Sequence, residues 1–424
     1  MKDYLNKLPK EIQDLIAQAS RIAKKDNIPI YLVGGFVRDL LLQAKNLDLD
    51  IVVEGSGLNF SEDLARALGA KLIQHKRFGT ATVILGGQMK IDITTARNEF
   101  YQLPAALPVV SSGTLKEDLF RRDFTINAMA IDISSDNFGR LIDFFGGKED
   151  LENRKICIMH NLSFIDDPTR ILRAIRFEQR YDFRLESMTE ILLREAVAKK
   201  MLEKVQPHRT RDDLILVLKE RKPIKEIKRI QELASFAFIH PKLSVTKEHY
   251  GLLRTLEKEI NWFKARFPQR RPLDSWILYF MGLINGLSAS DAASICRRFA
   301  FKRGEEKRIL SVKKIKRQLI SQLTSKKSRP SVIFDHLEPL SYEAIILLKA
   351  KFRNPVLQKN IRDFFRVYNG MCIQISGGDL HNLGVKPGPA YQKLFQKVLQ
   401  AKLNGEVDTE EEELRLIRKI IKCK

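Results

Sequence analysis

Apolar and polar positions follow two different periods along the chain. Residues 28–145 contain short apolar runs, such as IPIYLVGG (28–35) and ATVILGG (81–87), which are separated by glycine turns. Such runs predict strands, whereas FSEDLARALGA (60–70) has the three- and four-residue spacing of a helix. We therefore predict an α+β domain in this part of the chain.

From about residue 163 onward the apolar residues recur every three or four positions, as in MTEILLREAVAKKMLEKV (188–205). This spacing predicts helices with hardly a strand among them. The basic stretch from 297 to 329 predicts helices with a cationic face. We place soft boundaries that give an α+β head, a helical neck, a basic helical body and a helical tail, at 1–155, 156–225, 226–330 and 331–424.

The composition excludes several classes of protein. No apolar run approaches the roughly 18 residues of a membrane span, and the N-terminus lacks a signal-peptide core, so we expect a soluble, cytoplasmic protein. The four cysteines form no CxxC pair, so neither a disulfide framework nor a zinc site is expected. No protein partner is implied.

The net charge is the strongest compositional signal. The chain has 74 Lys and Arg against 52 Asp and Glu, a formal charge of +22. Such an excess favours a polyanionic partner, first of all nucleic acid, through counterion release. The alternative is a basic protein whose lysines are merely solvated.

Two aspartates interrupt a predicted strand. In NLDLDIVVE (46–54), Leu47, Leu49 and Ile51 alternate with Asp48 and Asp50, so both carboxylates share one face. Like charges there repel unless protons or cations intervene, which favours a divalent metal site. The alternative is the polar outer face of a half-buried strand.

The preceding turn carries two glycines and an arginine. Gly34 and Gly35 would let the backbone approach a phosphate closely, and Arg38 opens the following helix. A tight strand-to-helix turn would use the same residues, so this signal is weak by itself.

Several motifs together resemble a known family. They are LVGGFVRDLLL (32–42), LDLDIVV (47–53), DLFRRDFTINAMAI (118–131), LIDFFGG (141–147) and DDPTRILRAIRF (166–177). In this order and spacing they resemble the successive motifs of class II tRNA nucleotidyltransferases and bacterial poly(A) polymerases, within the polymerase β nucleotidyltransferase superfamily. The resemblance covers residues 31–185, with a weaker echo at 377–389.

The resemblance implies a template-independent enzyme that adds all or part of CCA to tRNA 3' ends, using CTP and/or ATP and releasing pyrophosphate. It implies Mg2+, with two ions expected, held by Asp48 and Asp50. Asp92 matches a third carboxylate that orients the primer hydroxyl, although an ordinary strand-face aspartate is the alternative. The family also leaves open a poly(A) polymerase or a non-catalytic RNA-binding protein, and does not decide between addition of CCA, CC or A.

The resemblance also implies a nucleotide-binding set: Gly34, Gly35, Arg38, Arg121, Arg122, Asp123, Asn127, Asp167, Arg170, Arg173 and Arg176. Within it, Asp167 and Arg170 match the pair that reads the base edge and are expected on one face of a helix. Asp166 stands where the family has a longer glutamate. Ordinary helix-start chemistry and a solvated arginine face are the alternatives.

Two further segments are less informative. Residues 96–119 contain two prolines and a Ser-Ser-Gly sequence, so we predict a loop there. Its form resembles a subgroup whose nucleotidyltransferase module often follows phosphoesterase and CBS modules, so the chain is either a short relative or part of a longer protein. The Gly-rich segment around His381 fits either RNA phosphate binding or a closing helical hairpin, and His381 itself is expected to be structural.

Overall fold

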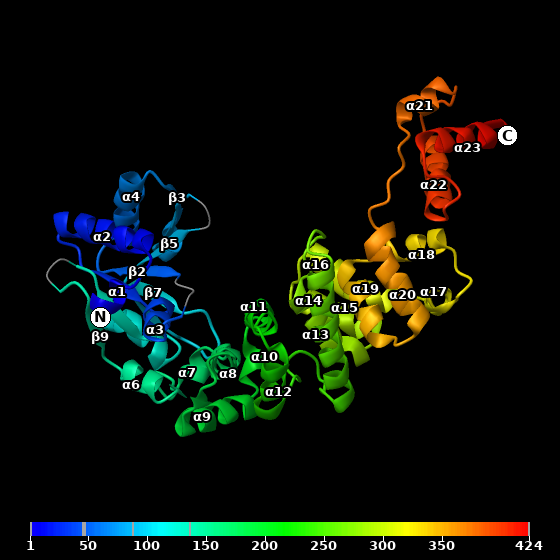
Figure 1. Cartoon of the computed structure of the whole chain (residues 1–424). Helices are drawn as coiled ribbons and strands as arrows, with labels where there is room; N and C mark the ends of the chain where they lie inside the picture. The colour runs from blue at the N-terminus through cyan, green and yellow to red at the C-terminus, as the bar shows by residue number, and fades with distance from the viewer. Residues whose placement is uncertain (1, 45–47, 87–88, 135–136, 423–424) are drawn as a thin grey trace. The chain divides into compact units, whose positions relative to one another are not determined.

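The computed structural model describes residues 2–44, 48–86, 89–134 and 137–422 (Figure 1). The chain forms two compact units, Met1–Phe238 and Ile239–Lys424. The finer boundaries near 155, 225 and 330 stay predictions. Leu47 of the predicted strand pattern and Cys423 lie outside the described residues, and none of the described helices is long and apolar enough to cross a membrane.

A seven-stranded mixed sheet organises the first unit, with the order β3-β4-β5-β2-β1-β8-β9. Its strands are β1 (Ile30–Val33), β2 (Leu49–Val53), β3 (Lys71–His75), β4 (Thr80–Ile84), β5 (Lys90–Thr95), β8 (Met129–Asp132) and β9 (Arg140–Asp143). Only the pairing of β2 with β5 is parallel among these strands. The α+β head is therefore confirmed.

The central strands are buried more completely than β3 at the edge of the sheet, where half-buried and exposed positions alternate. All residues of β1 and β8 are buried. Helix α4 (Gly57–Leu68) packs on β3, β4 and β5, and is itself packed by α2 (Lys10–Lys25). Ser56 caps α4 by accepting a hydrogen bond from the amide of Asn59 at 3.2 Å, and Gly69 ends it with φ 58°.

The structure corrects the loop that we predicted at 96–119. The segment forms an antiparallel hairpin of β6 (Arg97–Phe100) and β7 (Val109–Ser112), followed by α5 (Leu115–Phe120). The prolines lie between the two strands, where no ladder hydrogen bond is required of them, and Val109 and Val110 favour the extended chain. Thr114 and Glu117 form a capping box at α5.

Short elements complete the first unit. They are α1 (Lys2–Leu5), α3 (Gly35–Leu41), η1 (Lys76–Phe78), η2 (Thr125–Asn127), α6 (Gly147–Glu152), β10 (Lys155–Ile156), α7 (Ser163–Asp166), α8 (Arg170–Tyr181), β11 (Arg184–Leu185), α9 (Ser187–Ala198), α10 (Met201–Lys204), α11 (Pro207–Leu218) and α12 (Pro223–Leu233). After residue 163, the two-residue strand β11, which pairs with β10, is the one exception among the described elements of this unit to the helices that we predicted.

The second unit is helical throughout its described residues. Its elements are α13 (Lys247–Arg266), α14 (Ser275–Leu283), η3 (Ile284–Gly286), α15 (Ala289–Arg298), α16 (Arg303–Ser311), η4 (Val312–Lys314), α17 (Arg317–Thr324), α18 (Pro330–Leu337), α19 (Tyr342–Lys351), α20 (Pro355–Asp363), the π-turn η5 (Phe364–Tyr368), α21 (Gly377–Asn382), α22 (Pro389–Leu403) and α23 (Glu410–Lys422). The core helices α14 and α19 are packed against each other and α13. The last three helices enclose a separate apolar cluster around Leu380, Val398 and Ile417.

A buried carboxyl in α12 gives the first unit a predicted pH dependence. Glu226 is 2% exposed, and burial together with the nearby Glu220 raises its pKa from 4.5 to about 7. The folded pKa is the higher one, so the stability gained from the protonated carboxyl is fully present below about pH 4.5 and is lost as the pH rises through 7.

We expect the free energy of unfolding of the wild type to fall by roughly 2 to 3 kcal/mol more than that of Glu226→Gln between pH 5 and pH 8.5. Urea unfolding over this pH range measures the difference. Parallel pH profiles for the two proteins would show that Glu226 does not titrate in this way.

Candidate nucleotide site

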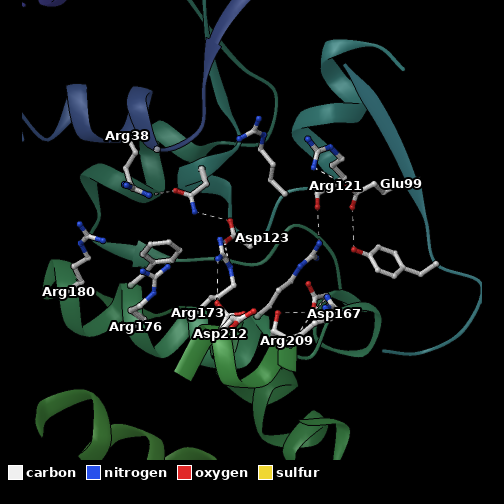
Figure 2. Close-up of a pocket in the computed structure, with 18 residues that line it drawn as sticks. Arg38, Glu99, Arg121, Asp123, Asp167, Arg173, Arg176, Arg180, Arg209 and Asp212 are labelled. Carbon is white, nitrogen blue, oxygen red and sulfur yellow. Dashed lines mark hydrogen bonds and ion pairs between the residues drawn. The ribbon is translucent and has the colours of Figure 1, made fainter. Parts of the chain in front are cut away.

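A cavity of about 680 Å³ lies in the first unit (Figure 2). It is lined by Gly35, Arg38, Glu99, Tyr101, Arg121, Arg122, Asp123, Asn127, Asp167, Thr169, Arg170, Arg173, Arg176, Phe177, Arg180, Arg209, Asp212 and Asp213. Of the eleven residues expected to bind nucleotide, all but Gly34 are in this lining. Segments far apart in sequence therefore meet around one cavity, and arginines predominate among its charged residues.

Gly34 matters for the cavity because it has no side chain, which leaves room for Arg122. It has φ 65° in the turn between β1 and α3, and a Cβ atom there would lie 2.4 Å from Nη1 of Arg122. The absent side chain thus lets a cavity arginine approach the backbone. Gly35 is less restricted, since its Cβ would meet Nη2 of Arg38 at an ordinary 3.5 Å.

We expect Gly34→Ala to weaken nucleoside triphosphate binding by roughly tenfold and to lower the melting temperature, because a side chain at this φ is strained and displaces Arg122. Gly35→Ala is the matched control and should cause a smaller loss. Equilibrium dialysis with ATP and thermal unfolding measure both effects. Equal losses from the two variants would contradict this role of Gly34.

A chain of polar contacts connects the glycine turn with α8. Arg38 donates to Oδ1 of Asn127, whose amide donates to Asp123 at 2.8 Å. The Nε of Arg173 donates to the other oxygen of Asp123 at 2.9 Å. Burial by itself would raise the pKa of Asp123, but Arg173 and Asn127 outweigh it and hold the pKa at about 2. Asp123 is therefore a fixed negative charge between arginines.

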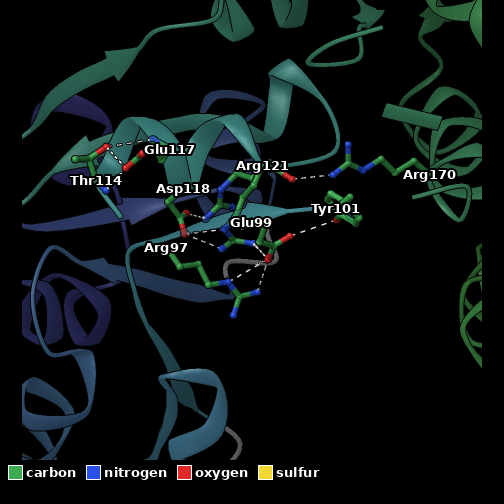
Figure 3. A network of polar contacts seen from close by, with 9 residues as sticks. Arg97, Glu99, Tyr101, Thr114, Glu117, Asp118, Arg121 and Arg170 are labelled. Atoms are coloured by element: carbon green, nitrogen blue, oxygen red, sulfur yellow. Dashed lines mark hydrogen bonds and ion pairs between the residues drawn. The ribbon is translucent and has the colours of Figure 1, made fainter. Parts of the chain in front are cut away.

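Arg121 and Arg122 share one buried carboxylate. Nη2 of Arg121 lies 2.7 Å from Asp118 and Nη2 of Arg122 lies 3.0 Å from its other oxygen. Figure 3 shows that Arg121 also meets Glu99 of the hairpin, at 3.1 Å. Burial raises the pKa of Asp118, but the two arginines lower it overall. We did not predict a role for either carboxylate from the sequence. The available signal was that Asp118 lies three residues before Arg121 and four before Arg122, the spacing of ion pairs on a helix.

The two residues that we expect to read the base are not on the same helix, contrary to the prediction. Arg170 is the first residue of α8, but Asp167 precedes that helix in an extended conformation, directly after the last residue of α7. Its Oδ1 accepts hydrogen bonds from the amide and hydroxyl of Thr169, at 3.2 and 2.8 Å. Both residues still line the cavity. Nη2 of Arg170 donates to the carbonyl oxygen of Arg121 at 2.8 Å.

Asp166, where the family has glutamate, ends α7 and lies 3.9 Å from Nε2 of His160. Its pKa is raised by burial, and the neighbouring cations only partly oppose this effect.

The first two turns of α11 supply cavity residues that we did not predict from the sequence. Arg209 lies 2.9 Å from Oδ1 of Asp167, and Asp213 lies 3.6 Å from Arg173. The spacing of Arg209 and Asp213, one helical turn apart after a helix-starting proline, was the available signal. Tyr101 is a further missed residue, and its hydroxyl faces Glu99 at 3.4 Å.

The predicted metal-binding carboxylates gather at the start of two neighbouring strands. Asp48 immediately precedes β2, and Asp50 lies directly opposite Asp92 in the parallel pair of β2 and β5. Burial raises the pKa of Asp50 to about 6, an effect that Arg122 and Lys90 oppose and that Asp92 and Asp48 reinforce. Asp50 therefore lies near Arg122, and none of the three aspartates is among the described residues that line the cavity.

The aspartates of β2 and β5 provide some, but not all, of the oxygen ligands that a hard cation such as Mg2+ requires. No group of three or more His, Cys, Asp or Glu side chains is arranged for a metal ion in the described parts of the chain. Both oxygens of Asp92 are occupied, by Thr82 at 2.7 Å and Lys90 at 2.6 Å. Asp48 and Asp50 are the carboxylates available to a divalent ion, whose remaining ligands would come from phosphate and water.

Comparisons with known proteins agree with this geometry. Residues 30–157 match the family model described as the poly A polymerase head domain. The chain is 36% identical to the A-adding tRNA nucleotidyltransferase of Geobacter sulfurreducens, over 96% of this chain and 47% of that protein. It is 30% identical to the A-adding tRNA nucleotidyltransferase of Halalkalibacterium halodurans, over 97% of this chain and 93% of that protein. The chain thus spans about half the length of the first relative and nearly all of the second.

Solved structures give the same result. A CCA-adding enzyme in its apo form II matches with a TM-score of 0.79 and 36% identity, over 99% of this chain and 98% of that one. The Thermotoga maritima CCA-adding enzyme in complex with tRNA matches with a TM-score of 0.73 and 34% identity, over 99% and 98%. CCA-adding enzymes solved with ATP and with CTP are also similar, at 34% identity and a TM-score of 0.75. By fold, by site geometry and by these likenesses, this chain belongs to the tRNA nucleotidyltransferase family.

Proposed function

We propose that the chain is a Mg2+-dependent nucleotidyltransferase that adds all or part of CCA to the 3' end of tRNA, as CMP and/or AMP from CTP and ATP. The observation that supports it best is the arginine-lined cavity, which contains Asp167 and Arg170 and whose Arg122 lies near the carboxylate Asp50. The net charge of +22 suits a tRNA partner, and we propose a cytoplasmic location.

The cavity arginines would bind the triphosphate. Arg122 lies between the Gly34 turn and the carboxylates, while Arg173 and Arg176 project from successive turns of α8. Guanidinium groups present forked donors to phosphate oxygens. Asp123 holds Arg173 in place, and Asn127 holds Arg38, through their own hydrogen bonds.

The base would meet Asp167 and Arg170. An ionised carboxylate only accepts hydrogen bonds and a guanidinium only donates them. Together they complement the amino donor and the ring-nitrogen acceptor that cytosine and adenine share, whereas uracil and guanine present other patterns. Selection by these side chains would replace selection by a nucleic-acid template.

In the reaction, the terminal hydroxyl of the RNA releases its proton to solvent as its oxygen bonds to the α-phosphorus, the bond from that phosphorus to the bridging oxygen breaks, and pyrophosphate leaves. Asp48 and Asp50 would hold the divalent ion, which when bound stabilises negative charge on the attacking and leaving oxygens. Asp92 keeps its carboxylate fixed through Thr82 and Lys90, on the strand beside Asp50. The arginines hold the triphosphate in line with the hydroxyl.

One alternative has an observation in its favour. The match to the poly A polymerase head domain fits an enzyme that adds many adenosines to diverse RNAs. A non-catalytic RNA-binding protein is disfavoured by the retained carboxylates and base-reading pair.

Incubation of the purified chain with tRNAs that end at the discriminator base, at C and at CC, each with CTP or ATP, tests the proposal. We expect stepwise addition that stops at CCA or at an intermediate of it, as sequencing of the products will show. Long adenosine tails on unrelated RNA would support the poly(A) polymerase, and absence of any product would refute both enzymes.

A further inference from the structure

The first unit contains a second cavity, of about 520 Å³, which we call the rear cavity. It lies between the segments 55–58, 77–79, 95–97 and 110–113, and none of the described residues lines both this cavity and the nucleotide cavity. In β5, which is parallel to β2, Asp92 lies near the start and Thr95 at the end. The rear cavity and the predicted metal-binding carboxylates are therefore toward opposite ends of these two strands.

The charged residues of the rear cavity are both cationic. They are Arg77 and Arg97, and the described lining contains no carboxylate. Arg77 forms no ion pair with any described residue, and its guanidinium lies 5.7 Å from the ring centroid of Phe78. Two guanidinium groups in a cavity without a carboxylate favour an anionic ligand, and their forked donors suit the oxygens of a phosphate group.

Arg97 is already oriented by the protein. Its Nε and Nη2 lie 3.1 and 2.9 Å from Oε1 of Glu99, a contact that Figure 3 shows. No described residue accepts a hydrogen bond from its Nη1. A guanidinium that is held along one edge loses little conformational freedom when a ligand binds at its remaining nitrogen.

The neutral groups of the rear cavity suit a nucleotide. Oγ of Ser56 accepts a hydrogen bond from the amide of Asn59 at 3.2 Å, and Oγ1 of Thr95 accepts one from the amide of Gly57 at 3.0 Å. Each hydroxyl therefore retains its proton for an acceptor on a ligand, such as a phosphate oxygen. The ring of Phe78, a residue that is 55% exposed, offers a flat apolar face on which a base can stack.

We propose that the rear cavity is a second binding site for a nucleotide, either free or as part of single-stranded RNA. Its phosphate group lies at Arg77 and Arg97, and its base stacks on Phe78. The described lining has no pair like Asp167 and Arg170 that could read a base edge, so the site accepts all four bases. The inference goes beyond the proposed function and does not depend on it, because it concerns binding alone.

UTP is the suitable free probe, because the base-reading pair of the nucleotide cavity should disfavour uracil. Equilibrium dialysis of the full chain measures the binding of UTP and, separately, of a short oligouridylate. We expect Arg77→Gln to weaken binding by roughly tenfold or more through the loss of charge-assisted hydrogen bonds. Phe78→Ala should weaken it by roughly fivefold or more through the loss of stacking.

Two further variants separate the rear cavity from other binding surfaces. Arg66→Gln is the matched control, since Arg66 is an exposed arginine in the last turn of α4, and it should bind both probes as the wild type does. Arg173→Gln alters the nucleotide cavity and should change UTP affinity by less than about twofold.

The two probes distinguish the sources of the ligand. A loss of UTP affinity in Arg77→Gln assigns the rear cavity to free nucleotides, and a loss seen with the oligouridylate alone assigns it to RNA. The inference is overturned if Arg77→Gln weakens the binding of neither probe. It is also overturned if UTP affinity falls in Arg173→Gln and not in Arg77→Gln, because UTP would then occupy the nucleotide cavity.

Discussion

Asp50→Ala should lower nucleotide incorporation by roughly a hundredfold to a thousandfold or more while leaving tRNA affinity nearly unchanged. Asp50 sits on a buried strand, and its pKa of about 6 reflects burial and the neighbouring Asp92 and Asp48. A carboxylate in these surroundings destabilises the strand. A role in binding a cation explains why an aspartate stands at this position. tRNA binding should persist because it depends on the many basic groups elsewhere.

Single-turnover incorporation into tRNA and filter binding of tRNA measure the two quantities. Asp63→Ala is the control, because the half-exposed carboxylate of Asp63 on α4 pairs with Arg66 of the same helix at 3.1 Å. Turnover by Asp50→Ala within tenfold of the wild-type rate would remove Asp50 from the mechanism.

Arg170→Ala should relax the choice of nucleotide, not slow all four nucleotides equally. The guanidinium offers a charge-assisted hydrogen bond to the base, worth about 1.5 to 3 kcal/mol, so incorporation of the favoured nucleotide should fall by roughly 10- to 100-fold relative to UTP and GTP. The variant also leaves the carbonyl oxygen of Arg121 without its partner at 2.8 Å, so some stability is lost as well.

Steady-state kcat/KM values for the four nucleotides on one tRNA measure this change. Restoring the family's glutamate in Asp166→Glu should alter the preference between CTP and ATP if that position supports the pocket. An equal loss for every nucleotide from Arg170→Ala, with the fold intact, would demote the arginine to phosphate binding or structure.

The sequence predicted those parts of the site that depend on local spacing. Gly34, Asp48 and Asp50 lie in short segments where strand alternation and a tight turn restrict the backbone, so their placement beside β1 and β2 followed from pattern. Arg173 and Arg176 likewise follow helical spacing and line the cavity. The order of the motifs indicated the family, which the fold and the comparisons confirm.

The contacts between distant segments could not be predicted in this way. Arg209 meets Asp167 across 42 residues, and only the packing of α11 beside α8 brings them together. Asp167 itself was wrongly placed on a helix, because Asp-Pro-Thr fits a helix start and the end of α7 left no separate signal. We did not predict the hairpin at 97–112, because each of its strands has only four residues. The prolines and the glycine of the same segment favoured a loop instead.

The central claim is that side chains of this chain select the nucleotide added to tRNA. Its most direct test offers all four nucleotides together, at equal concentrations, to the wild-type chain and a tRNA with an incomplete 3' end, and sequences the products. We expect only cytidine, only adenosine, or the two in CCA order, and Arg170→Ala should admit uridine and guanosine. Wild-type products that contain all four nucleotides in similar amounts would contradict the claim.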